Sequence, residues 1–171
     1  MTWTAPTPSP VDGPLTGTDR PMLEGYLDWQ RATLLNICAG LTGEQLAQQS
    51  VPRSNLSLLG LVRHLAKVER TWLSQRALGK PVEPMYDPAL GKDADFEDLD
   101  PAEAPAALHR LQDEWVASNR AAARLSFEAP VATGEDVLSL RMVYVHLIGE
   151  YSRHNGHADL LRQSIDGTTG R

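Results

Sequence analysis

The sequence predicts an all-α protein, specifically a four-helix bundle with long crossover connections. Apolar residues recur at helical spacing in four long stretches, and no stretch shows convincing β-type alternation. Two connections are too long for tight turns, which favours crossovers over a simple up-and-down meander. At 171 residues, of which 42% are hydrophobic, the chain is long enough for one domain with a hydrophobic core.

The chain begins with a segment that lacks helical or strand periodicity. Residues 1–18 are rich in Pro, Thr and Gly, and we expect them to form a flexible N-terminal arm. Residues 19–171 are expected to form the helical domain. Asp19 can cap the first long helix, with Pro21 near its first position, and Gly40 suits a left-handed end.

A short helical turn and the second long helix follow. Thr42 and Gln45 have the spacing of a capping box, in which each side chain bonds the other residue's backbone N–H. Ser57 is placed to cap the second long helix, and Gly79 ends it before Pro81.

The second half of the chain is expected to hold a crossover and two more helices. Residues 80–99 contain three prolines and then four acidic residues, which indicates a solvated crossover over the bundle surface. Asp100 and the proline after it begin a third helix that runs to about Leu125. A break over residues 128–135 precedes a fourth helix over residues 139–165.

Composition excludes several classes of function. A formal net charge of −6 argues against nucleic-acid binding, which needs clustered Lys and Arg, and also against docking on anionic membranes. No stretch approaches the roughly 20 apolar residues of a membrane span, and no secretory signal is visible. Cys38 is the single cysteine, which fits a reducing compartment. We therefore expect a cytoplasmic protein.

The fourth helix carries a cluster of residues that can bind metal. His146, Glu150, His154 and His157 fall within roughly 80° around a helix axis and so share one face. Glu150 and His154, one turn apart, can reach a single cation. On the second helix His64 lies among apolar residues and is expected to point into the same interior. Two histidines and one glutamate would leave an open position on zinc, as in catalytic sites.

The same residues also have ordinary structural interpretations. His64 could be a core histidine with a satisfied hydrogen bond. His146 and His157 could simply cap the helix or form hydrogen bonds with neighbouring residues. Glu150 could form an ion pair with Arg153 or Arg63. Cys38 has no charged partner nearby in sequence and is expected to be inert packing.

Two segments resemble a known superfamily. Residues 61–72 (LVRHLAKVERTW) and 150–159 (EYSRHNGHAD) are similar to those of the DinB/YfiT-like superfamily. The most similar branch contains mycothiol-dependent S-transferases, maleylpyruvate isomerases and mini-circle proteins. The resemblance implies that His64, Glu150 and His154 bind zinc, with nickel as the other metal used. It implies that His157 and His146 either support the ligands from outside the metal's coordination sphere or contact the substrate, and it identifies no catalytic residue beyond the metal ligands.

The resemblance also implies an activity. It points to a metal-dependent transferase that uses a low-molecular-weight thiol such as mycothiol, with the metal activating the thiolate toward an electrophile. The expected partners are therefore a small-molecule thiol and an electrophile, and a homodimer is conceivable. Two other functions stay open at this point. One is a metal-dependent hydrolase, and the other is a non-enzymatic, stress-induced metal-binding or interaction protein.

Overall fold

The computed structural model describes residues 2–87, 89, 91 and 93–170. Met1 of the expected arm, positions 88, 90 and 92 of the expected crossover, and position 171 lie outside the described residues. The helices and strands are α1 (Asp19–Cys38), α2 (Gly43–Ala47), α3 (Leu58–Glu69), α4 (Ala104–Ala122), β1 (Pro130–Thr133), β2 (Asp136–Ser139) and α5 (Leu140–Asp166). A π-helical stretch over Arg70–Arg76 extends α3, and short 3-10 turns cover Ala94–Phe96 and Pro101–Glu103.

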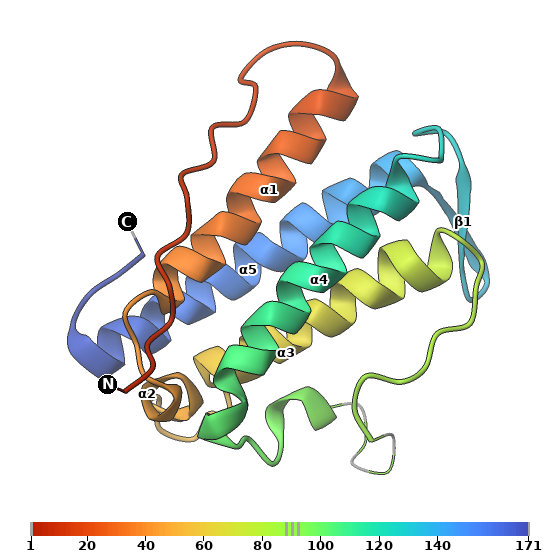
Figure 1. Ribbon diagram of the computed structural model, residues 1–171. Helices are drawn as coiled ribbons and strands as arrows, with labels where there is room; N and C mark the ends of the chain where they lie inside the picture. The colour runs from red at the N-terminus through yellow and green to blue at the C-terminus, as the bar shows by residue number, and fades with distance from the viewer. Residues whose placement is uncertain (1, 88, 90, 92, 171) are drawn as a thin grey trace.

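The predicted fold class is confirmed. Figure 1 shows α1, α3, α4 and α5 side by side in one bundle, with α1 against α5 and α3 against α4. The long crossover connects α3 to α4, and the β1–β2 hairpin lies at one end of the bundle. None of the described helices is both long enough and apolar enough to cross a membrane.

Most helix ends follow from local sequence. The Ser57 hydroxyl accepts a hydrogen bond from the Gly60 amide at 3.0 Å, and Ser139 caps α5 in the same way. The capping box of Thr42 is present. Gly167, with φ of 80°, ends α5 in the left-handed conformation that glycine adopts at little cost. The start of α1 differs from the prediction, because Asp19 is its first residue and Thr18 is its N-cap.

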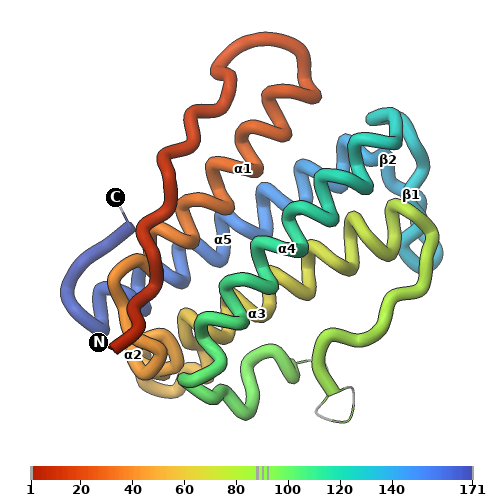
Figure 2. Tube along the Cα trace, viewed as in Figure 1, coloured from red at the N-terminus to blue at the C-terminus, as the bar shows by residue number. Residues whose placement is uncertain are grey.

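The N-terminal segment lies along the bundle (Figure 2). Its Ala5 is buried, the Ala5 amide donates to the Leu41 carbonyl at 2.9 Å, and the Gly40 amide donates to the Ala5 carbonyl at 2.8 Å. Figure 2 also shows both termini at the end of the bundle where α2 lies. Backbone hydrogen bonds therefore tie this segment to the loop after α1.

The expectation that the chain has no β structure was wrong for residues 130–139. They form a two-stranded antiparallel hairpin in which Thr133 pairs with Asp136. Gly134, with φ of 70°, permits the two-residue turn. Val131 is fully buried, whereas Val137 is 67% exposed. With a single strand residue fully buried, the alternation is too short to be recognised in the sequence.

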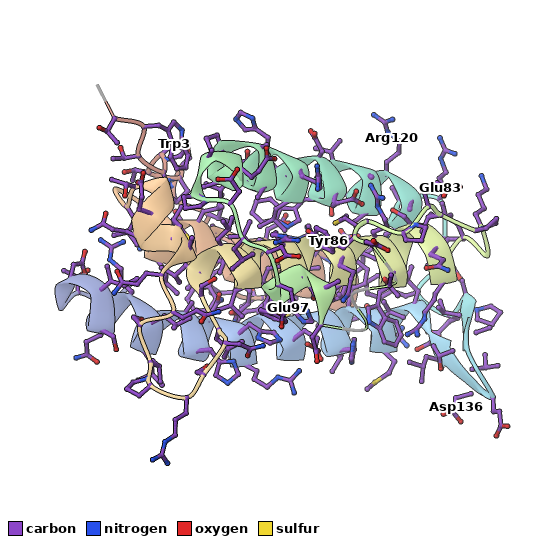
Figure 3. The ribbon with its side chains drawn as sticks, turned by 90° about the horizontal axis from the view of Figure 1, so that it is seen from below. Trp3, Glu83, Tyr86, Glu97, Arg120 and Asp136 are labelled. Carbon is purple, nitrogen blue, oxygen red and sulfur yellow. The ribbon has the colours of Figure 1, made fainter. Side chains whose placement is uncertain are left out.

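The expectation of a fully solvated crossover was also wrong, because its Ala94–Phe96 turn is buried against α3. Figure 3 labels Tyr86 and Glu97 on this crossover. The Tyr86 hydroxyl donates to the Arg63 carbonyl at 3.0 Å, and the Arg63 guanidinium donates to the Glu97 carbonyl at 2.9 Å. The acidic stretch is thus partly anchored on the helix that carries His64.

A buried polar network joins the four long helices. The Arg31 guanidinium of α1 donates to both carboxylate oxygens of Glu69 on α3, at 2.7 and 2.8 Å, and both side chains are almost fully buried. The Tyr151 hydroxyl of α5 donates to Glu69 at 3.0 Å, and the Trp115 indole of α4 donates to Tyr151 at 2.7 Å. Since buried charges are tolerated only when paired and hydrogen-bonded, this network restricts how the helices can slide past one another.

Candidate metal centre

Three of the predicted site residues converge between α3 and α5. His64 comes from α3, while Glu150 and His154 come from successive turns of α5. One nitrogen or oxygen atom of each lies within 4.8 Å of the corresponding atoms of the other two. The His64 and His154 rings meet edge to face, with centroids 4.7 Å apart. A cation placed among these atoms could contact all three side chains after small rotamer adjustments.

His154 supplies the observation that tests whether a metal fits. Its Nε2 is buried and has no hydrogen-bond partner within the described part of the chain. Burial lowers the pKa of His154 to about 4, and the nearby His64 contributes in the same direction. The ring is therefore neutral at pH 7. A neutral imidazole nitrogen, buried and without a partner, is what a metal ligand requires before the ion binds.

Glu150 provides the carboxylate. Its Oε2 lies 3.4 Å from His154 Nε2, but the two atoms lack the geometry of a hydrogen bond. Arg153 Nη2 contacts both carboxylate oxygens, at 3.0 and 2.9 Å, so the ion pair considered from the sequence is present. The Arg153 side chain is 60% exposed, and a pair of that kind stabilises little and leaves the carboxylate available.

His64 has a partner that the sequence did not reveal. Its Nδ1 lies 2.6 Å from Oδ2 of Asp95, a buried residue of the crossover, and Lys67 Nζ lies 2.5 Å from the other carboxylate oxygen. Four acidic residues in a short stretch suggested a solvated run. The one sequence feature that could have indicated burial of Asp95 is its neighbour Phe96, because an aromatic residue in an acidic stretch marks a place where the chain can return to the core.

The two flanking histidines lie beside the three converging residues. His157 Nδ1 is 3.4 Å from His154 Nδ1. His146 Nε2 is 3.9 Å from Glu150 Oε1, and its ring packs on Trp72 with centroids 4.2 Å apart. Burial lowers the pKa of His146, although the Glu150 carboxylate opposes that effect, so His146 is also neutral at pH 7.

The chain's cysteine does not offer a competing reactive centre. Cys38 lies at the end of α1 and is fully buried. Burial raises the pKa of its thiol to about 12, so the thiolate is scarce at neutral pH. The structure therefore agrees with inert packing for this residue.

The three converging side chains are partly exposed. His64, Glu150 and His154 are respectively 21%, 17% and 9% exposed, so the site is sheltered without being closed. Two imidazole ligands and one carboxylate would leave a divalent ion with a net charge of about +1.

Comparison with known proteins places the site within a described family. A family model described as mycothiol-S-transferase matches residues 22–167, a range that includes every residue of the site. No curated protein and no solved structure shows a significant match to the chain.

Proposed function

Because the chain belongs to the mycothiol-S-transferase family and is thus a thiol S-transferase, we propose that His64, Glu150 and His154 hold a divalent metal for this reaction. The unpartnered, buried Nε2 of His154 carries the proposal. Zinc suits two imidazoles and a carboxylate with a position left open, and nickel accepts the same kinds of donor. Mycothiol, the thiol in the family's name, is the proposed co-substrate.

A divalent metal bound there would supply the positive charge that stabilises the thiolate of the co-substrate at neutral pH. The chain's own residues determine how much charge is available. A carboxylate ligand such as Glu150 contributes one negative charge to the set, while imidazole ligands contribute none. Arg153 contacts both oxygens of the Glu150 carboxylate from an exposed position.

His146 is suited to receive the proton that the thiol loses. Its ring is neutral at pH 7, its Nε2 lies beside Glu150, and Trp72 packs against it. In the transfer itself the thiolate sulfur forms a bond to an electrophilic carbon, and the leaving group departs with the electrons of the broken bond. The proton on His146 then returns to solvent.

The metal is tested by turnover before and after its removal. Wild-type protein, stripped with a chelator and reloaded with zinc, is incubated with mycothiol and a bimane-type electrophile. We expect turnover with zinc, background rate without it, and background rate for H64A and H154A after reloading. H109A is the matched control, because His109 is exposed on α4 and lies outside the site.

Two results would contradict this proposal. Full turnover by the stripped protein would exclude a metal-dependent reaction. Zinc-dependent cleavage of esters or amides without any thiol, combined with no thiol transfer, would favour the hydrolase considered from the sequence. Membership of an enzyme family already disfavours the non-enzymatic alternative.

A further inference from the structure

Asp95 is a buried carboxylate with a specific pair of partners. It is 0% exposed, although it lies in a crossover that is otherwise largely exposed. Its two oxygens are divided between His64 Nδ1, at 2.6 Å, and Lys67 Nζ, at 2.5 Å. A buried carboxylate costs free energy unless it is hydrogen-bonded, and these two contacts offset that cost.

The chemistry of Asp95 fixes which nitrogen of His64 carries the proton. One oxygen of the Asp95 carboxylate accepts a hydrogen bond from the Lys67 ammonium, and the other faces Nδ1 of His64. A carboxylate paired with an ammonium group can only accept hydrogen bonds. Nδ1 of His64 must then be the donor, and in the neutral ring the lone pair is left on Nε2.

The ring of His64 is also restrained by packing. Phe96 stacks on it, with ring centroids 5.3 Å apart and planes inclined by 28°. The turn that carries Asp95 and Phe96 is itself fixed on α3. Arg63 donates to the Ala94 carbonyl at 3.1 Å, and Gly60 leaves room for the Phe96 ring, since a Cβ at that glycine would lie 2.8 Å from Phe96 Cδ1.

We infer that Asp95 is a positioning residue of the metal centre, which holds His64 so that Nε2 is the ring nitrogen left for the ion. This inference rests on the proposed function. It makes the Ala94–Phe96 turn of the crossover a part of the site, although the turn supplies no metal ligand. A carboxylate on the distal nitrogen of a ligating histidine fixes the tautomer and makes the ligating nitrogen more basic.

A purely structural role for Asp95 makes different predictions. In that case Asp95 serves only to neutralise Lys67 and to anchor the crossover. K67M should then lower the zinc affinity of the site as much as D95N does. In the positioning role D95N is the harmful change. In D95N the Lys67 ammonium would stay bonded to the amide oxygen of the asparagine, so the amide NH2 would face His64 Nδ1. An NH2 donor there favours the tautomer with the proton on Nε2, which is the nitrogen needed for the metal.

The first experiment measures the tautomer in the metal-free wild-type protein. Long-range 1H–15N correlation NMR at pH 8 identifies which nitrogen of His64 is protonated. We expect the proton on Nδ1. A proton on Nε2 in the wild-type protein would overturn the inference, and this measurement does not depend on any variant folding.

The second experiment measures zinc affinity by competition with a chromophoric chelator. We expect D95N to weaken zinc binding by about 10- to 100-fold and K67M to change it by less than about threefold. Urea unfolding of the metal-free variants shows whether each is folded. Zinc binding by D95N within threefold of wild type would overturn the inference and leave the proposed function standing. Failure of the wild-type protein to bind zinc would overturn both.

Discussion

Glu150 Oε2 and His154 Nε2 face each other at 3.4 Å, one helical turn apart on α5, without hydrogen-bond geometry. His154 is neutral at pH 7, and its Nδ1 lies 3.4 Å from His157 Nδ1, where a proton can be shared. With that proton on Nδ1, Nε2 and the carboxylate oxygen are two acceptors directed at each other. Such a pair is costly when buried unless a cation lies between them.

The carboxylate of Glu150 should therefore matter for its charge as well as its shape. E150Q keeps the side-chain volume but removes the negative charge, and we expect zinc affinity to fall by at least tenfold. R153Q is the matched control, because it removes the exposed ion pair and leaves the carboxylate in place. Its effect on affinity should be less than about 1 kcal/mol. Equal losses in the two variants, measured by chelator competition, would show that the ion pair is what matters.

Gly60 should be required for the shape of the site although it touches no ligand. A Cβ there would lie 2.8 Å from Phe96 Cδ1, so G60A should displace the Ala94–Phe96 turn and weaken zinc binding several-fold. At Gly149 of α5 an added Cβ meets no atom within 4 Å in the described part of the chain. G149A should instead stabilise the protein by about 0.5–1 kcal/mol, the usual gain in a helix. If G60A behaves like G149A both in zinc binding and in urea unfolding, the Ala94–Phe96 turn is not coupled to the site.

The metal-free protein should lose stability as the pH falls from 7 to 5. Burial gives His154 a pKa of about 4 in the folded state, below its ordinary value of 6.5. Between these values the unfolded chain binds more protons than the folded one, so the free energy of unfolding falls as the pH falls. H154Q lacks this group. Urea unfolding of chelated protein at pH 7 and pH 5 should show the larger loss in wild type, and parallel profiles for the two proteins would be inconsistent with a buried neutral His154.

The Arg31–Glu69 pair should stabilise the bundle strongly. E69Q leaves the nearly inaccessible Arg31 guanidinium without its main counter-charge, which we expect to cost about 3–5 kcal/mol in free energy of unfolding. D28N is the control, since Asp28 binds the same guanidinium but its side chain is 44% exposed. That change should cost no more than about 1 kcal/mol. Similar losses in both variants, measured by urea unfolding, would contradict the importance of the buried contact.

The features that could be predicted from the sequence depend on neighbours along one helix. Ser57, Ser139 and Gly167 determine helix ends through backbone groups within a few residues, and the shared face of Glu150 and His154 follows from helical periodicity. That His64 lies close to Glu150 and His154 was predicted from the apolar residues around His64 and from the family resemblance. The structure brings these three side chains together.

The features that were missed depend on contacts between distant segments. Asp95 is acidic and lies among other acidic residues, and its burial follows from His64 and Lys67, which are 31 and 28 residues away. Val116 of α4 is apolar, yet it is 59% exposed, so hydrophobicity alone does not decide which residues are buried. Neither outcome can be calculated from local propensity.

The amount of zinc bound per chain shows whether His64, Glu150 and His154 form a metal site. Wild type, H64A, H154A and the H109A control are purified without chelator, dialysed against the same zinc solution, and measured by elemental analysis. We expect one zinc ion per chain in wild type and H109A, and a small fraction of that in H64A and H154A. Unchanged zinc content in either of these two variants, with all four proteins folded, would contradict metal binding by His64 and His154.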